Sequence, residues 1–437
     1  MTKITFFLTI LTAAFSAAQN PIVPAGTYLA DPSAHVWSDG KLYIYGSLDE
    51  SPEYYCSNRH HVLVTDDLKT WKIVEDVFAS SGPNDQVPLT DAPLFAPDCM
   101  YKDGAYYLYY CTPDVHHAEG VAASSSPVGP FINGRALDLH GYNQIDPSVF
   151  IDDDGQAYYL WGQFTAKMAK LKQNMIELEA ETIKDSVLTE AEHHFHEGGF
   201  LTKRNDIYYF IYAHMGRSQK PTCIGYATAS SPMGPYRYGG VIIDNDNCDP
   251  GNWNNHGSIA EFNGQWYIFY HRATHNSNMM RKACVEPITF NADGTIDEVE
   301  MTSQGAGGPL NALEMIEAER ACILGGNVRV ELCAPGDEQL AQIHNGDRAA
   351  FKYVDFGAGV DQVIVQSTPQ NGGVIEFSLD YPWRGSVGRI VIPAGDGKTR
   401  QTFTGALQAD GVHALWLRFY GTGGDLFSVD GIQFVKK

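Results

Sequence analysis

The chain contains few charged residues, and acids predominate among them. Only 19% of its 437 residues are charged, and 52 Asp and Glu against 30 Lys and Arg give a formal net charge of −22. Such a surface repels phosphate backbones, which argues against nucleic-acid binding. A neutral, bulky substrate or a divalent cation is compatible with it. The low charged fraction also argues against a disordered chain.

Long apolar runs are also missing, and the only marked apolar stretch opens the chain. Lys3 precedes an apolar run from Ile4 to Phe15, and Ser16-Ala17-Ala18 offers a small-residue cleavage site before Gln19. The run is too short to span a membrane. We therefore expect residues 1–18 to be a signal peptide and the protein to be secreted or periplasmic, with no membrane span. The alternative is an ordinary buried N-terminal strand.

Cysteines are few, and none has the CxxC spacing of a zinc site. Export would permit disulfides among the eight. Cys322 and Cys333 lie close together in the sequence and could pair, whereas spacing leaves the other pairings open.

Aromatic residues, by contrast, are abundant: 24 Tyr, 21 Phe and 7 Trp. An apolar strand, a turn that usually contains Asp-Gly or Asn-Gly, and an aromatic strand recur together, as in a β-hairpin. The five copies cover residues 33–47, 99–111, 148–162, 199–213 and 258–272. Further strands follow each copy, so the repeats predict an all-β fold with a five-bladed β-propeller over 20–303. Independent hairpins in a sandwich are the alternative.

The repeats stop near residue 303. Residues 304–313 are small and read as a linker. From 314 to 437 shorter β-rich segments follow one another, which predicts an antiparallel β-sandwich, or jelly roll, as a second domain.

Three acids occupy equivalent places at the start of repeats. Asp31 opens the first unit, Asp146 the third and Glu197 the fourth. A propeller gathers such positions around its axis, so the three carboxyls should share one pocket. Inverting glycoside hydrolysis needs an acid and a base, and a third carboxylate can raise the pKa of the acid. A single Asp-Pro would be read as a turn, but three equivalent acids favour catalysis.

These segments resemble glycoside hydrolase family 43. The resemblance covers about 21–303 and rests on the Ala30-Asp31-Pro32-Ser33, Ile145–Phe150 and His196–Phe200 segments and on the five-repeat layout. It implies that Asp31 is the general base, Asp146 the pKa modulator and Glu197 the general acid. Gly198-Gly199 departs from the Gly-Pro that more often follows the acid.

Other residues on the same edge are candidates for the rest of the site. We expect Asp98 to hydrogen-bond the sugar, or else to be a turn acid. The candidates for the wall around the substrate are Trp161, Phe195, His196 and Arg272; the alternative for Trp161, Phe195 and Arg272 is a place in the core or behind the residues that contact the sugar. His256 is similar in position to a histidine that faces a metal in many family members, and calcium suits this acidic setting.

The C-terminal region resembles a family 6 carbohydrate-binding module. Support comes from the segments 316–319, 353–357 and 427–431. The resemblance implies a structural calcium held by Glu317, Glu319 and Asp430. Where that family often has a tryptophan after the last aspartate, this chain has Gly431. Tyr353, Trp383 and Trp416 are the aromatic candidates for stacking on sugars, although Trp416 alternates with core residues.

Together the three acids and the two family resemblances imply an exo-acting, inverting glycoside hydrolase for plant-wall polysaccharide or oligosaccharide. The expected activity is that of an α-L-arabinofuranosidase, a β-D-xylosidase or both. A galactofuranosidase or β-galactosidase is the alternative within the family. A non-catalytic propeller lectin is the alternative of another class, and it has no need of the three acids.

Overall fold

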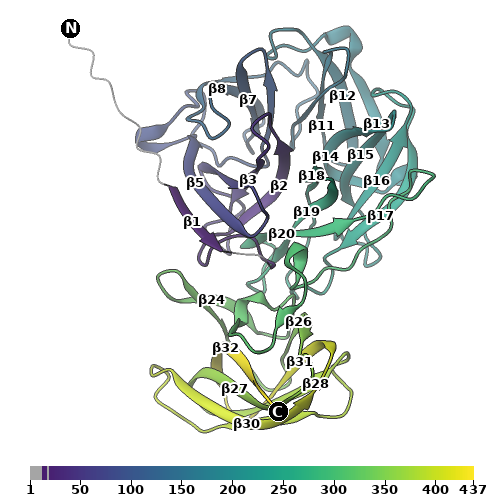
Figure 1. Ribbon diagram of the computed structural model, residues 1–437. Helices are drawn as coiled ribbons and strands as arrows, with labels where there is room; N and C mark the ends of the chain where they lie inside the picture. Colours follow the sequence, from purple (N-terminus) through teal and green to yellow (C-terminus); the bar gives the residue numbers. More distant parts are fainter. Residues whose placement is uncertain (1–11, 17–18) are drawn as a thin grey trace.

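The computed structural model describes residues 12–16 and 19–437 and consists of two β-rich domains, a propeller and a smaller C-terminal domain beneath it (Figure 1). The one α-helix in the described residues is the single turn α1 (Glu190–His193). The predicted all-β class is confirmed. Within the same residues, no helix has the length and apolar character needed to cross a membrane.

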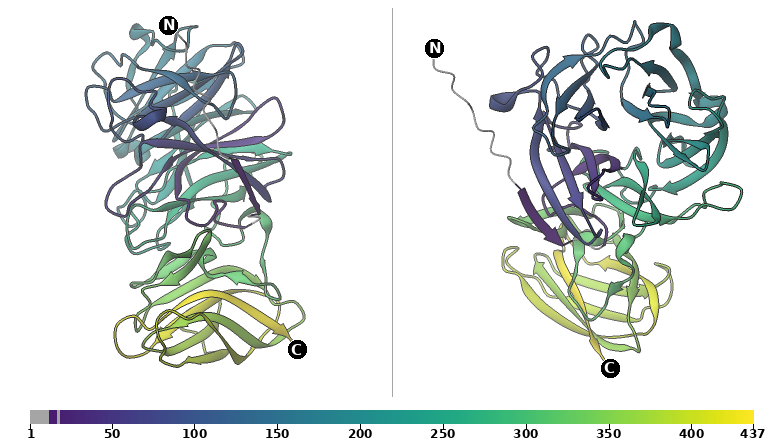
Figure 2. Two further views of the ribbon diagram at one scale, coloured as in Figure 1. Left: turned by 90° about the vertical axis from the view of Figure 1, so that its left-hand side faces the viewer. Right: turned by 45° about the horizontal axis from the view of Figure 1, so that its top comes forward.

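Five antiparallel sheets form the ring of the propeller, which confirms the predicted five blades (Figure 2). Blade one comprises β2 (Leu29–Val36), β3 (Leu42–Leu48), β4 (Arg59–Thr65) and β5 (Thr70–Ala79); blade two comprises β6 (Asp98–Lys102), β7 (Ala105–Cys111), β8 (Glu119–Ser124) and β9 (Ile132–Ala136); blade three comprises β10 (Ser148–Ile151), β11 (Ala157–Trp161), β12 (Thr165–Leu171) and β13 (Lys184–Thr189); blade four comprises β14 (Phe195–Arg204), β15 (Ile207–His214), β16 (Cys223–Ala229) and β17 (Arg237–Asp244); blade five comprises β18 (Ser258–Phe262), β19 (Gln265–Ala273) and β20 (Arg281–Ile288). Short 3₁₀ turns are η1 (Gly82–Asn84) and η2 (Ala180–Thr182).

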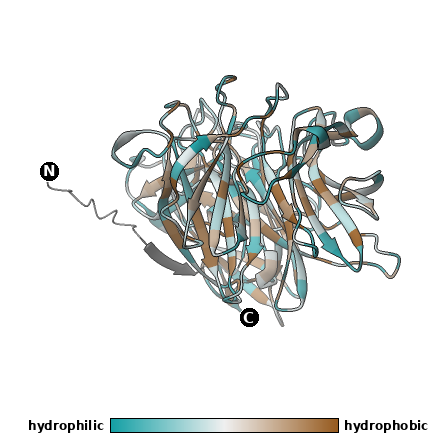
Figure 3. Ribbon diagram, turned by 90° about the horizontal axis from the view of Figure 1, so that it is seen from above, coloured by the Kyte–Doolittle hydropathy of each residue, from teal (hydrophilic) through white to brown (hydrophobic). Residues whose placement is uncertain are grey.

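Local turn chemistry explains the hairpins, and alternation explains the packing. Asp103-Gly104 and Asn263-Gly264 both adopt positive φ, with φ of 50° and 90° and of 52° and 80°, as a two-residue hairpin turn of this type requires. Tyrosines and aliphatic residues of adjacent blades then pack against each other, for example Tyr45 of blade one and Leu108 of blade two. Apolar and polar residues accordingly alternate along the strands (Figure 3).

The ring closes where the two ends of the propeller sequence meet at blade five. The backbone N–H of Ile22 donates to Ala283 O at 2.9 Å, and the Asn20 side chain donates to Val285 O and Thr302 O. The N-terminal segment thus lies beside β20. The hydroxyl of Ser258 also accepts from Ala34 N, which joins blade five to blade one.

The C-terminal domain is a curled antiparallel sheet wrapped around one core. Its strands are β21 (Leu310–Asn311), β22 (Ile316–Glu317), β23 (Ile323–Gly325), β24 (Arg329–Ala334), β25 (Asp337–Ala341), β26 (Arg348–Asp355), β27 (Val360–Pro369), β28 (Gly373–Leu379), β29 (Gly388–Ile392), β30 (Gln401–Ala409), β31 (Val412–Tyr420) and β32 (Phe427–Lys436), with η4 (Ala318–Arg320) between β22 and β23. Hydrogen bonding between its two sheet halves occurs at the pairing of β29 with β30. Phe351 and Leu415 of one half pack against Val429 and Ile432 of the other.

The segment between the domains is anchored on both sides. The backbone N–H groups of Ser303 and Gln304 donate to Lys352 O at 2.6 and 3.0 Å, and η3 (Gly305–Gly307) follows directly. Further backbone hydrogen bonds join the domains at Leu324 N to Cys248 O and at Val330 N to Thr274 O, each 2.8 Å. The domains therefore share a continuous interface rather than a flexible tether.

The structure bears on two further predictions from the sequence, the signal peptide and the disulfide between Cys322 and Cys333. Most of the predicted signal peptide lies outside the described residues, except that β1 (Thr12–Ser16) pairs antiparallel with β5. All eight cysteines fall in the described part, where each is a free thiol, so Cys322 and Cys333 are not paired. The Cys322 thiol lies against Ala350 O, whereas that of Cys333 lies 3.7 Å from an Asp430 oxygen.

Candidate active site

Distorted strand backbone brings the three acids into position. Asp31 and Asp146 adopt left-handed φ of 52° and 62°, a conformation that costs energy for residues other than glycine and that gathers at functional sites. The register of β2 shifts between Ala30 and Ser33, and that of β14 shifts on both sides of Glu197. Such bulges redirect a side chain away from the regular alternation of a strand. The distortion thus turns these carboxyls toward the propeller axis.

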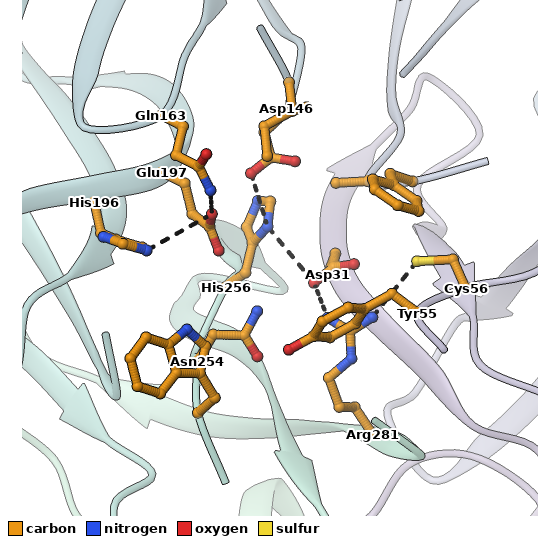
Figure 4. A pocket seen from close by; sticks show the side chains of 14 residues that line it. Asp31, Tyr55, Cys56, Asp146, Gln163, His196, Glu197, Asn254, His256 and Arg281 are labelled. Atoms are coloured by element: carbon orange, nitrogen blue, oxygen red, sulfur yellow. Dashed lines mark hydrogen bonds and ion pairs between the residues drawn. The ribbon is translucent and has the colours of Figure 1, made fainter. Parts of the chain in front are cut away.

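The three carboxyls line one cavity of about 200 Å³ (Figure 4). Every blade contributes to its wall, which comprises Asp31, Tyr55, Cys56, Phe95, Ala96, Ile145, Asp146, Gln163, His196, Glu197, Trp253, Asn254, His256 and Arg281. The acids are nearly buried, with 5–8% of their surface exposed. A reaction here would proceed largely shielded from bulk water.

Asp31 is held as a carboxylate. Arg281 Nη1 donates to its Oδ1 at 2.8 Å, and the Ser47 hydroxyl donates to its Oδ2 at 2.6 Å. Burial alone would raise the pKa of Asp31, but the charge of Arg281, with smaller effects from His256 and His271, holds it well below its usual range. Asp31 therefore stays ionised, as a general base must.

Asp146 has the opposite environment. Burial, followed by the charges of Glu197 and Asp31, raises its pKa well above the usual range. The nearest nitrogen of an ionisable group is His256 Nδ1, 3.9 Å from Oδ2 and also 3.6 Å from Asp31 Oδ1. Burial lowers the pKa of His256, so its imidazole is neutral and offsets little of this repulsion. Asp146 thus retains a proton more readily than an isolated carboxyl does.

Glu197 is oriented by side chains at the mouth of the pocket. Gln163 Nε2 donates to Glu197 Oε2 at 2.8 Å, and His196 Nε2 lies 3.9 Å from the same oxygen. The following residue, Gly198, has φ of 63°, and a Cβ there would come within 2.7 Å of His256. A Cβ at Gly199 would lie 2.6 Å from the Phe210 ring. Two glycines therefore let the backbone behind Glu197 pack tightly against the axis.

Of the five predicted substrate contacts, His196 lines the pocket but Asp98 does not. Asp98 is 1% exposed and lies deeper in the propeller. It accepts hydrogen bonds from Ser33 Oγ at 2.6 Å, Ser148 Oγ at 3.0 Å and Val149 N at 2.7 Å, and it pairs with His35. These partners belong to blades one and three. The structure thus makes Asp98 a link between blades rather than a sugar contact.

Trp161, Phe195 and Arg272 also lie outside the pocket, so they do not form the predicted wall around the substrate and instead take the alternative, buried positions. Trp161 is 1% exposed and its indole donates to Tyr142 O, while Phe195 packs in a core with Phe210 and Tyr212. Arg272 donates to Thr302 O and Arg320 O. For Phe195 and Arg272 strand alternation is the reason: their neighbours His196 and His271 face the axis, so these two residues face away.

Several pocket residues escaped the sequence analysis. Arg281, Gln163, Tyr55, Cys56 and Trp253 belong to no repeat motif. Some of these residues could have been found from the repeats, because the second strand of each blade ends beside the start of the first. Ser47, Cys111, Gln163 and His271 all lie within two residues of that end, and each contacts one of the three acids or its backbone.

The predicted calcium ligands of the C-terminal domain are not gathered around one point. Among the described residues, the group close enough to share a metal is Cys333, Asp337 and Asp430. Arg400 Nη2 already lies 2.6 Å from Asp430 and 2.9 Å from Asp337. Glu317 and Glu319 are absent from that group. A thiol and a guanidinium do not suit a hard, oxygen-binding cation, so this arrangement does not fit calcium.

Comparison with known proteins agrees with this geometry. The family model of glycosyl hydrolases family 43 matches residues 18–296, and that of the family 6 carbohydrate binding module matches 317–436. A Xylosidase/arabinosidase of Thermoclostridium stercorarium is 30% identical over 92% of this chain and 96% of its own length. An Arabinoxylan arabinofuranohydrolase of Bacillus subtilis is also 30% identical, over 93% and 91%.

A solved structure gives the same picture for the propeller. It is a family 43 β-xylosidase/α-arabinofuranosidase from a compost microbial metagenome, in complex with xylotriose and in a calcium-free form. It has 30% sequence identity and a TM-score of 0.55, and the match covers 66% of this chain and 99% of that one. With three acids converging at the axis of five blades, and with relatives aligned over nearly the whole chain, this glycoside hydrolase belongs to family 43 and has a family 6 carbohydrate-binding module as its C-terminal domain.

Proposed function

We propose that the protein is an inverting exo-glycosidase that releases single α-L-arabinofuranosyl or β-D-xylosyl residues from plant-wall polysaccharide or oligosaccharide. The main support is the contrast between two acids in one pocket: the pKa of Asp31 is lowered and that of Asp146 is raised. Inverting hydrolysis needs an ionised base and a proton on the acid; Asp31 meets the first need, and the burial and repulsion that raise the pKa of Asp146 favour a proton within the pair that Asp146 forms with Glu197. The names of the relatives favour the two pentose sugars.

In the proposed reaction, Asp31 takes a proton from a water molecule as that water attacks the anomeric carbon. Glu197 gives its proton to the departing glycosidic oxygen, whose bond to the anomeric carbon breaks. Asp146 has no bond to make or break. Burial and the charge of Glu197 raise the pKa of Asp146, so the two carboxyls hold a proton between them inside the pocket.

Exo action is supported by the size of the cavity. At about 200 Å³ it is smaller than the roughly 300–1,000 Å³ of pockets that enclose drug-sized ligands. Its walls come from all five blades, so a single sugar ring fits more readily than an internal segment of a polysaccharide.

The experiment is a screen of 4-nitrophenyl glycosides followed by proton NMR of the first sugar released. We expect turnover of the α-L-arabinofuranoside or the β-D-xyloside, with the product anomer opposite to that of the substrate. Turnover of only the galactofuranoside or galactoside would shift the specificity to the alternative substrates. Sugar binding without any turnover would favour a lectin, and a retained anomer would refute the mechanism.

We further propose that the C-terminal domain binds polysaccharide through an exposed aromatic surface. Trp383 is 78% exposed and Tyr381 53%, with Arg384 stacked 5.4 Å from the centre of the Tyr381 ring. Trp416 is 8% exposed, in keeping with its alternation with core residues. Retention on insoluble arabinoxylan should fall in Trp383→Ala and stay unchanged in a matched substitution of exposed Val391. Equal retention of both variants would place sugar binding elsewhere.

A calcium ion near the propeller axis is also proposed, with His256 and water molecules as its ligands. The imidazole is buried and neutral and lies within 4 Å of two carboxylates, and water-mediated binding suits calcium. Removal of calcium by a chelator should lower the melting temperature, and added calcium should restore it. An unchanged melting temperature after chelation would contradict the site.

Export is proposed on the basis of Lys3, the apolar run that follows and the small residues before Gln19. Mass spectrometry of protein recovered outside the cytoplasm should find an N-terminus near Gln19. Recovery of the intact N-terminus would instead favour a retained strand beside β5.

A further inference from the structure

The hairpin of β19 and β20 has two functional faces. Arg281 lies opposite Ala273, and Lys282 lies opposite Arg272, so alternate residues face opposite sides of the blade. On one face Arg281 holds Asp31, and His271 accepts a hydrogen bond from the backbone of Asp31. On the other face Arg272 and Lys282 meet the C-terminal domain. The strand that positions the catalytic base is therefore also an interface strand.

Glu338 of the C-terminal domain is the partner of that second face. Its Oε2 accepts from Lys282 Nζ at 2.6 Å, and its Oε1 accepts from the Tyr28 hydroxyl at 2.7 Å. The Lys282 ammonium also lies 4.6 Å from the centre of the Tyr28 ring. Lys282 and Glu338 have no exposed surface. A single carboxylate of one domain thus fixes two segments of the other.

Both segments lead directly to the catalytic base. Lys282 adjoins Arg281, and Tyr28 precedes Asp31 by three residues. The carbonyl of Tyr28 accepts from Asp49 N at 2.8 Å. Asp49 in turn accepts from Arg281 Nε at 2.8 Å and from Nη2 at 2.9 Å. Tyr28 and Lys282 therefore anchor both sides of the ion pair that holds Asp31.

No other described acid replaces Glu338 in this cluster. Glu319 lies nearby, but burial, followed by the charge of Glu338, raises its pKa to about 7, and one of its oxygens is buried without a partner. Loss of one member of a buried ion pair leaves an uncompensated charge, which strongly perturbs its surroundings. Removal of Glu338 should therefore shift Lys282 and Tyr28.

We propose that Glu338, in the carbohydrate-binding module, is a positioning residue for catalysis: through Lys282 and Tyr28 it fixes the Arg281–Asp31 pair in the propeller pocket. The inference rests on the role proposed for Asp31. It assigns the C-terminal domain a part in the hydrolysis of small substrates that never reach its own surface. The effect is on the orientation of the base, because Glu338 lies on the far side of the blade from the cavity.

The test is Glu338→Gln in the full chain, assayed on the best 4-nitrophenyl substrate. We expect kcat to fall on the order of tenfold, as small misplacements of a catalytic group do, with KM changed less than about twofold, because the base contributes little to ground-state binding. Glu300→Gln is the matched control. Glu300 also joins the domains, through Lys352 and Tyr353, but it is exposed, and those contacts do not lead to Asp31. The control should keep its kcat.

A double-mutant cycle separates positioning from general damage. In an Asp31→Asn background, Glu338→Gln should cause no further loss of kcat, since the base on which it acts is gone. A full additional loss, an unchanged kcat in the single variant, or a loss confined to KM would overturn the inference. If Asp31→Asn keeps the wild-type rate, the role proposed for Asp31 fails first, and this inference fails with it.

Folding must be checked by thermal melting of each variant. Should Glu338→Gln not fold, Lys282→Met combined with Glu338→Leu removes both buried charges together and is assayed by the same criteria. A wild-type kcat in that pair would refute the inference. Failure of this pair to fold would also refute it, because Glu338 would then serve the fold alone.

Discussion

Replacement of Arg281 by methionine should shift the acidic limb of the pH profile of kcat/KM to higher pH. Arg281 Nη1 lies 2.8 Å from Asp31, and among the described residues it is the one permanent cation paired with this carboxyl. The other basic partners are His256 and His271, and burial lowers the pKa of both, to about 3 for His271. Above that pH His271 provides a hydrogen bond but no charge. Methionine removes the charge while keeping much of the volume.

The size of the shift follows from the contact. A nearby opposite charge lowers a carboxyl pKa by about 1–3 units, so its loss should raise the pKa of Asp31 by that amount. Burial, no longer opposed by Arg281, acts in the same direction. Because the base works only when ionised, kcat/KM should fall about tenfold for each pH unit below the new pKa. Well above that pKa, the rate should approach that of wild type.

The assay is kcat/KM for an aryl glycoside measured from about pH 3 to pH 8. Arg281→Lys is the control, since it keeps the charge and should shift the limb less. A loss of the same size at every pH would refute the reasoning and would indicate that Arg281 acts on geometry or on the sugar. Thermal melting must show that both variants are folded at each pH, because Asp49 also loses a buried partner.

The remaining predictions concern the acid, the blades and the domain interface. Glu197→Gln should lower turnover of natural glycan on the order of 10²-fold or more but should affect a substrate with a very acidic phenol leaving group much less; equal losses would exclude Glu197 as the acid. Asp98→Asn should lower the free energy of unfolding by roughly 1.5–3 kcal/mol in urea titrations, as for loss of a hydrogen bond to a charged group; an unchanged value would contradict its linking role. A chain ending at residue 303 should melt below the full protein, because Lys282 and Arg272 lose buried partners; equal melting would show that the domains are independent.

The five repeats and the three acids could be predicted from the sequence because both depend on residues that are close together in the chain. Asp-Gly and Asn-Gly turns set the hairpins, and repetition of the unit placed Asp31, Asp146 and Glu197 at equivalent strand starts. These features need only nearby residues to define them. The five blades were therefore predictable without knowledge of any contact between them.

The parts that sequence analysis missed depend on alternation and on distant pairing. Arg272 was expected at the pocket and Arg281 was missed because no motif reveals which face of blade five looks toward the axis. Residues 304–313 were interpreted as a linker because their small side chains give no sign that the backbone at its start donates hydrogen bonds to Lys352 O. Likewise, the resemblance to a carbohydrate-binding module grouped Asp430 with Glu317 and Glu319, whereas Arg400, thirty residues earlier, pairs with Asp430 in the fold.

The closure at blade five has a consequence for how the chain reaches its native state. Asn20 donates to Val285 O across 265 residues of sequence, and to Thr302 O across 282. Contacts of such separation are slow to form and leave their partners exposed until then. During synthesis, the N-terminal segment must wait for almost the whole propeller to emerge. Substitutions at Asn20 should therefore slow refolding more than they alter any single blade, and a ribosome-bound chain that stops short of β20 should remain an open ring.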